Sequence, residues 1–360
     1  MNEKMNIKTL DEETFVRKFS FRDFEGERKG RLWRIWSVAV FNMTHQWNRS
    51  SWLKILIGFV VMMLLIQNMI LLLIKDQFLL MGMTPTEFFT DQLRGTAMGI
   101  VQFYNTISTP DGIGISIGGI SLFMLICVVL MGSGLIADDI QFKATEVYYA
   151  KLNKSEYILG KFGAFFLFGN LFFTLPMVVE WLLLGIGIGN VDMIAALPLL
   201  LEVVIFTEVV TLVYGSISLA FSSLTTKRLY AGLIMFIVVF LISIIVPSLT
   251  FQATEFTPLM YIDIFSVLAV FANLLAGKSS VVWNGVQGPI TLDLTSTAGL
   301  MVIPILGFYI LAGLAIVVFQ VYKSHSQEIM GNTLNRFSSI LAQIRGGSTN
   351  KQLFKEEAQP

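Results

Sequence analysis

Long apolar stretches alternate with shorter polar ones over most of this sequence. Six of the apolar stretches reach the roughly 20 residues that a membrane-spanning helix needs. They run approximately over 53–74, 113–136, 162–189, 195–224, 230–251 and 299–322. The pattern predicts an all-α polytopic membrane protein with six transmembrane helices.

A seventh apolar stretch, 259–276, is shorter, and the distribution of charge decides how it is counted. With six spans and the N-terminus inside, all of the 25 Lys and Arg residues except Lys75, Arg94 and Lys278 fall on the cytosolic side, in line with the positive-inside rule. A seventh span would move the basic C-terminal residues outside. We therefore expect both termini to be cytosolic and 259–276 to form a re-entrant or surface-lying segment on the outer side.

The segments outside the predicted spans are polar. Residues 1–30 have mixed charge and lack the apolar core of a cleavable signal peptide, so the first span is expected to act as an uncleaved signal anchor. In 31–49, tryptophans recur at helical spacing opposite basic residues, which predicts a helix lying at the membrane surface. The segments 75–112 and 252–298 are expected to be outer loops, and 324–360 a polar cytosolic tail.

Composition agrees with a membrane protein. Hydrophobic residues make up 54% of the chain and charged residues 14%, whereas charged residues are about a quarter of a soluble domain. The mean hydropathy is +0.70. The formal net charge is zero, so nothing points to nucleic acid, and membrane lipids are the expected surroundings.

The sequence offers no catalytic or metal-binding pattern. Gly277-Lys278-Ser279 resembles the end of a phosphate-binding loop, but Ala272 stands where that loop needs its first glycine. His45 and His325 have no metal-ligand spacing, and Cys127 is the single cysteine. We expect no enzyme activity, no metal and no cofactor bound by this chain.

A Gly-Ser-Gly sequence lies inside the second predicted span, at Gly132, Ser133 and Gly134. A serine nucleophile needs a base within hydrogen-bonding reach, and no predicted span contains a histidine. We interpret the two glycines as sites where helices pack closely.

Three glutamates lie inside predicted spans, namely Glu180, Glu202 and Glu208. No predicted span contains a Lys or Arg in its interior, and a lone carboxylate at the centre of a membrane helix costs on the order of 3 kcal/mol. Two explanations stay open. The glutamates line a translocation cavity for a cationic or hydrogen-bond-donating substrate, or they are protonated and bonded to neighbouring Asn and Thr side chains.

The stretch between the second and third spans carries a recognisable pattern. Gly-x-Gly-x-Ile-Ala-Asp at 132–138 is followed by Glu-x-Tyr at 146–148 and by Ser-x-Tyr-Ile-Leu-Gly-Lys at 155–161. This pattern resembles the permease subunits of ABC transporters of the type-2 exporter class. The resemblance extends over 31–323, with 31–49 similar to the elbow helix of that family and the segment from 256 onwards similar to its outer segment.

The resemblance implies a permease that works as a dimer with the same or a homologous chain. Two separate ATPase subunits would bind ATP and Mg²⁺, and the loop 137–161 would be the coupling segment that seats in an ATPase groove. Export across the plasma membrane of a prokaryote is the implied activity.

Apolar residues of this loop are expected to dock on the ATPase and charged ones to orient it. The expected coupling residues are Asp138, Asp139, Ile140, Lys143, Glu146, Val147, Tyr148 and Lys151. Lys227 and Arg228, between the fourth and fifth spans, are a second expected contact. The alternative is that the loop is a solvated connector.

Two other functions remain open from the sequence. One is a secondary transporter or channel driven by an ion gradient, in which Glu180, Glu202 and Glu208 relay the ion. The other is a membrane scaffold for a larger complex.

Overall fold

The computed structural model describes residues 30–101, 107–108, 120–145, 148, 152–250, 258–285 and 288–323. In this part of the chain, six helices are long and apolar enough to cross a membrane: Ser51–Leu80, Ser121–Gln141, Lys154–Ile188, Leu197–Leu224, Arg228–Val246 and Thr297–Lys323. They confirm the six predicted spans. The protein is therefore a helical, multi-pass membrane protein.

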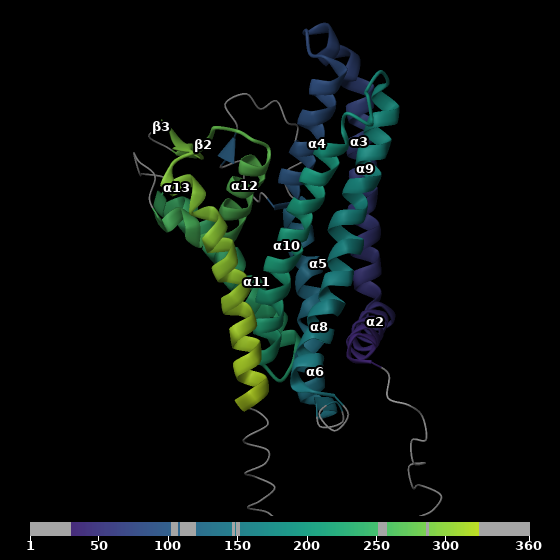
Figure 1. The fold of residues 1–360 in the computed structure, drawn as a ribbon, viewed down its shortest axis with the longest axis vertical. Helices are drawn as coiled ribbons and strands as arrows, with labels where there is room; N and C mark the ends of the chain where they lie inside the picture. Colours follow the sequence, from purple (N-terminus) through teal and green to yellow (C-terminus); the bar gives the residue numbers. More distant parts are fainter. Residues whose placement is uncertain are drawn as a thin grey trace, which may run out of the picture.

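The elements follow one another along the chain as Figure 1 labels them. The first half contains α2 (Arg31–Arg49), α3 (Ser51–Leu80), α4 (Pro85–Val101), β1 (Ile107–Ser108), α5 (Ile120–Gly132), α6 (Gly134–Gln141), α8 (Lys154–Gly169), a π-helix η1 (Asn170–Thr174) and α9 (Leu175–Ile188). The second half contains α10 (Leu197–Leu224), α11 (Arg228–Thr250), a 3₁₀-helix η2 (Pro258–Ile262), α12 (Ile264–Leu275), β2 (Ser280–Gly285), β3 (Gly288–Asp293), α13 (Thr297–Leu300) and a last helix at 302–323.

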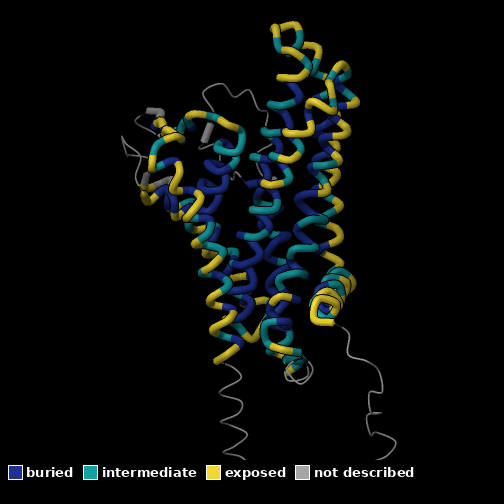
Figure 2. The backbone as a smooth tube through the Cα atoms, viewed as in Figure 1, coloured by how far each residue is buried: buried dark blue, intermediate teal, exposed yellow. Residues whose placement is uncertain are grey.

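The span formed by α5 and α6 lies at the centre of the molecule. Its most apolar window is 78% buried, whereas the other five spans are 22–44% buried. Buried residues accordingly follow the inner helices in Figure 2, and exposed ones follow the outer faces of the bundle. Exposed side chains on those outer faces are largely apolar, for example Leu73 on α3 and Leu311 on the last helix. Such a surface suits contact with lipid.

The two ends of the bundle differ. One end carries α2, the connection from α6 to α8 and the turn between α10 and α11, and we call it the loop end. The opposite end carries the start of α4, together with α12 and the strands, and we call it the sheet end (Figure 1).

The predicted outer loop 75–112 is wrong over much of its length, because α3 continues to Leu80 and α4 occupies Pro85–Val101. Thr84 starts α4 with a reciprocal cap: its backbone N–H donates to Glu87 Oε2 at 2.9 Å, and its hydroxyl accepts from the Glu87 N–H at 3.2 Å. The helix then buries Phe88, Phe89 and Leu93 completely. Polar residues at its other positions lower the mean hydropathy of α4, so the apolar pattern did not predict this helix.

A small antiparallel sheet at the sheet end, with strand order β1-β2-β3, was not predicted. Its main hairpin pairs Trp283 with Ile290 and Val281 with Leu292. The hairpin follows α12, which is the helix within the predicted segment 259–276. With 12 residues, α12 is too short to span a bilayer.

Candidate functional site

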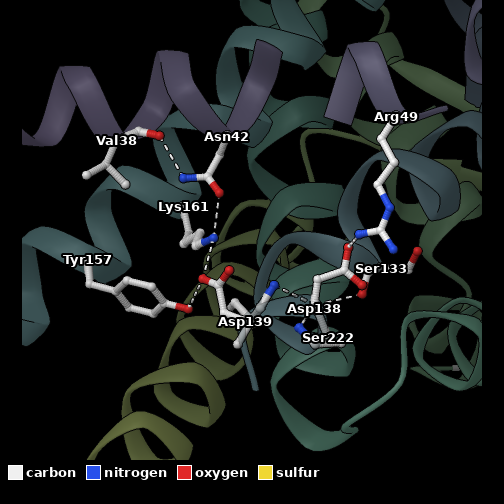
Figure 3. A network of polar contacts seen from close by, with 11 residues as sticks. Val38, Asn42, Arg49, Ser133, Asp138, Asp139, Tyr157, Lys161 and Ser222 are labelled. Carbon is white, nitrogen blue, oxygen red and sulfur yellow. Dashed lines mark hydrogen bonds and ion pairs between the residues drawn. The ribbon is translucent and has the colours of Figure 1, made fainter. Parts of the chain in front are cut away.

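A buried lysine holds three helices together at the loop end. The Lys161 side chain on α8 is 1% exposed, and its ammonium group lies 2.5 Å from Asp139 Oδ2 on α6 and 2.5 Å from Asn42 Oδ1 on α2. Tyr157 donates its hydroxyl to the same Asp139 oxygen at 2.8 Å (Figure 3). The predicted third span began at residue 162, so this lysine had been placed just outside it.

Two further ion pairs fasten α2 to the same neighbours. Near the start of α2, Arg34 contacts the buried Glu156 of α8 at 2.7 Å. At its end, Arg49 contacts Asp138 of α6 at 2.5 Å (Figure 3). Between them Gly160 lets the helices approach closely, because a Cβ there would lie 2.6 Å from Val38 Cγ1. Helix α2 is thus attached to α6 and α8 along its length.

The break between α5 and α6 is also held by side chains. The Ser222 hydroxyl of α10 donates to the Ser133 carbonyl at 2.8 Å and accepts from the N–H groups of Ile136 and Ala137 at 3.0 Å each. A Cβ on Gly132 would lie 1.6 Å from Ser218 Oγ. The interpretation of these glycines as packing sites is confirmed at Gly132.

The predicted coupling residues fall into different surroundings. Asp138 and Asp139 are engaged in the ion pairs within the chain. Ile140 is half-buried, whereas Phe142 and Lys143 at the turn are exposed, and Lys143 has a positive φ of 54°. Glu146, Val147 and Lys151 lie outside the described residues.

Tyr148 packs inward on the buried network. Its ring lies 5.5 Å from the Tyr157 ring, and the Lys161 ammonium is 5.4 Å from its centroid. Burial, with a smaller contribution from Asp139, raises the pKa of Tyr148 to about 12. The residue therefore stays neutral at physiological pH and connects the loop to α8.

A groove of about 240 Å³ opens beside this network. It lies between α6, the turn 225–227 and the end of the last helix, and Ile140, Thr226 and Val321 are among the residues that line it. Lys227 is exposed at this turn, while Arg228 donates to the Leu130 carbonyl at 2.7 Å. Of the two residues predicted as a second contact, Lys227 is thus on the surface and Arg228 supports α5.

Glu202 has a basic partner, contrary to the expectation that none was available. Arg94 of α4 contacts it through two hydrogen bonds, from Nε to Oε1 at 2.8 Å and from Nη2 to Oε2 at 2.7 Å. The sequence prediction missed this pair because it placed Arg94 in a loop. The Thr84 and Glu87 cap, followed by apolar residues at helical spacing, was the signal that could have revealed α4.

Glu208 and Glu180 differ from Glu202 and from each other. Glu208 accepts from Asn170 at 3.3 Å and from Thr174 at 3.4 Å. Both partners lie in η1, the π-helical turn just before Pro176, a residue without the N–H that a regular helix needs. Glu180 is 2% exposed, and neither of its carboxylate oxygens has a hydrogen-bond partner in the described part of the chain.

Over the described ranges, no group of three or more His, Cys, Asp or Glu residues lies close enough to hold a metal ion. No family model matches the chain, and no curated protein matches it. The class of protein that the fold defines is a helical multi-pass membrane protein. Further assignment depends on the ion pairs of the loop end and on the three glutamates of the spans.

Proposed function

We propose that this chain is the permease subunit of an ATP-driven ABC transporter of the type-2 exporter class. It would form the translocation pathway with a second permease chain, identical or homologous, in the plasma membrane of a prokaryote. A separate ATPase, binding ATP and Mg²⁺, would dock at the loop end, which would face the cytosol together with both termini.

The observation that carries the proposal is that the two ends of the loop 137–161, in α6 and at the start of α8, are fastened to α2 and to each other by ion pairs. A permease without nucleotide chemistry must receive work through a stiff element, because mobile side chains would absorb a displacement instead of passing it on. Asp139 and Asp138 fix α6 to its neighbours through Lys161 and Arg49. A force on the exposed turn would therefore move α2, α6 and α8 together.

The surface of α2 supports its role as an interfacial elbow helix. Trp33 and Trp36 are each 52% exposed, Leu32 is 82% exposed and Phe41 is 56% exposed. Exposed aromatic and aliphatic side chains next to arginines are typical of helices at the headgroup level. An elbow in this position would couple the loop end to the membrane surface.

The ATPase itself is the first test. We expect the tagged chain, extracted from its native membrane in mild detergent, to co-purify with a soluble protein that carries a Gly-x-x-x-x-Gly-Lys-Ser/Thr loop. Phe142→Asp, at the exposed turn, should lower the amount of bound ATPase about tenfold or more. Met81→Asp, at a residue that is also exposed but lies at the sheet end, is the matched control and should leave the amount of bound ATPase unchanged. Recovery of no ATPase with either chain would overturn the proposal.

Coupling is the second test. We expect Tyr148→Ala and Glu146→Lys to leave ATP hydrolysis in place and to abolish its link to transport in reconstituted vesicles. If transport continues unchanged, the loop is a connector.

The ion-gradient alternative has less support. Arg94 balances the charge of Glu202, and Glu208 is bonded to Asn170 and Thr174. Transport that persists without ATP and stops when a proton or sodium gradient is collapsed would favour that alternative.

A further inference from the structure

Another groove lies on the surface of the described bundle. It is an apolar groove of about 280 Å³ between α3 and α9, and we call it the α3–α9 groove. Its mouth is formed by half-exposed aliphatic residues such as Leu65, Leu175 and Val179, which are 50%, 50% and 41% exposed. These residues belong to two spans, so the groove opens toward the lipid rather than toward the bundle centre.

Two polar residues of the membrane spans, Asn68 and Glu180, interrupt the apolar lining. Asn68 donates its amide nitrogen to the Leu64 carbonyl at 2.9 Å, and its Oδ1 atom is buried without a hydrogen bond in the described structure. Both carboxylate oxygens of Glu180 are also buried without a hydrogen bond in the described structure. The Thr96 hydroxyl lies beside the carboxylate and accepts from Gln67 Nε2 at 2.8 Å.

Further buried polar atoms without a hydrogen bond lie on α3, α4 and α9 in the described structure. The side-chain oxygens of Gln67 and Gln92 are also buried and unbonded over the described ranges. The unbonded donors in this region of the described chain are Gln92 Nε2 and Trp181 Nε1. A buried acceptor without a donor costs about 1–3 kcal/mol, and an unpaired carboxylate costs more. The unbonded atoms of the residues that line the groove are three oxygens, on Asn68 and Glu180, and their complement is a group with several N–H donors and a positive charge.

We propose that the α3–α9 groove binds a single-chain amphiphile with a primary ammonium group. The ammonium group would contact Glu180 and Asn68, since its three N–H bonds match acceptors and its charge matches the carboxylate. The hydrocarbon chain would lie along the aliphatic walls. No Lys or Arg is among the described residues that line the groove, so the phosphate of a phospholipid would find no basic side chain beside Glu180. This inference goes beyond the proposed function, because it is argued from the groove alone and holds without an ATPase.

Binding can be measured on the full chain in phosphatidylcholine nanodiscs, which contain no primary amine. We expect tritiated dodecylamine to bind saturably at one site per chain in equilibrium dialysis. Glu180→Gln should weaken this binding about tenfold or more, since it removes a charge-assisted hydrogen bond. Glu208→Gln is the matched control, because Glu208 lies outside the groove lining and should leave binding unchanged. Asn68→Leu keeps the carboxylate and should cause a smaller loss.

Val179→Trp, which fills the mouth of the groove, should also abolish binding. Equal binding by wild type and Glu180→Gln, or equal competition by dodecanol, would overturn the proposal in favour of apolar contact alone. If sodium chloride competes with dodecylamine when the total ionic strength is held constant, the ligand of the groove is a small cation and not an amphiphile. Competition by phosphatidylethanolamine would replace it with a lipid headgroup, and a change in the number of subunits in Val179→Trp would replace it with a second copy of the chain.

Discussion

The loop end and the α3–α9 groove both contain buried charged side chains, but their pairing is opposite. At the loop end, Lys161 faces Asp139 and Asn42, and Glu156 faces Arg34. At the groove, Glu180 and Asn68 retain acceptors without a donor in the described structure. A buried charge that faces an opposite charge resists movement, whereas one that faces none has free energy to gain from a ligand. The first arrangement suits transmission of force, and the second suits binding.

Breaking the pairing at the loop end should have the largest effect. Lys161→Met removes the ammonium group and leaves the Asp139 carboxylate, 13% exposed, without its basic partner, which costs about 3–5 kcal/mol of folding free energy. Unfolding in mixed detergent micelles measures this loss. The double variant Lys161→Met with Asp139→Leu removes both charges and should recover much of the stability. If the double variant is as unstable as the single one, packing of the lysine stem and not the ion pair holds the three helices.

Removing the unpaired carboxylate at the α3–α9 groove should raise the stability of the protein instead of lowering it. Glu180→Met replaces the unpaired carboxylate with an apolar side chain of similar length, so we expect the unliganded protein to gain about 1–3 kcal/mol of stability. The same unfolding measurement applies, in phosphatidylcholine and without any amine. A loss of stability in Glu180→Met would mean that the carboxylate already has a partner in the protein, and the contrast between the two regions would disappear.

Particular elements show how far the sequence could lead. The six spans were predictable because each is a nearly continuous apolar run, a pattern that the bilayer itself enforces. Helix α4 was missed because Gln92, Thr96 and Arg94 lower its hydropathy, although they are buried or paired in the structure. Short strands such as β2 give too weak a signal beside helical segments.

The site could be predicted less well than the fold. The loop 137–161 was singled out, and several of its charged residues are in contact. Apart from the pair of Lys161 with Asp139, their partners come from α2, which in the case of Asn42 and Lys161 lies more than a hundred residues earlier. Such pairings depend on how helices pack, and a single sequence contains no signal for them. Glu180 was singled out together with Glu202 and Glu208, and only the structure separates the three by their partners.

A third acid, Asp263, lies between the two cases and gives the smallest expected effect. It is buried at the start of α12, where it accepts hydrogen bonds from the N–H groups of Phe265 and Ser266 at 3.3 and 3.1 Å and from the Ser266 hydroxyl. Burial raises the pKa of Asp263 above its usual range, and the hydrogen bonds oppose this rise only in part. Hydrogen bonds alone thus leave the buried Asp263 carboxylate only partly compensated.

The sign of the resulting pH dependence follows from the raised pKa. The stability that protonated Asp263 contributes is complete below the ordinary aspartate pKa of about 4 and is lost as the pH rises through the higher pKa of the folded state. Asp263→Asn keeps a side chain that caps helices well but does not titrate. We therefore expect the thermal midpoint of wild type, measured from pH 4 to pH 8, to fall relative to that of Asp263→Asn as the pH rises. Parallel curves would show that the hydrogen bonds to α12 compensate the charge fully, which would group Asp263 with the paired residues of the loop end.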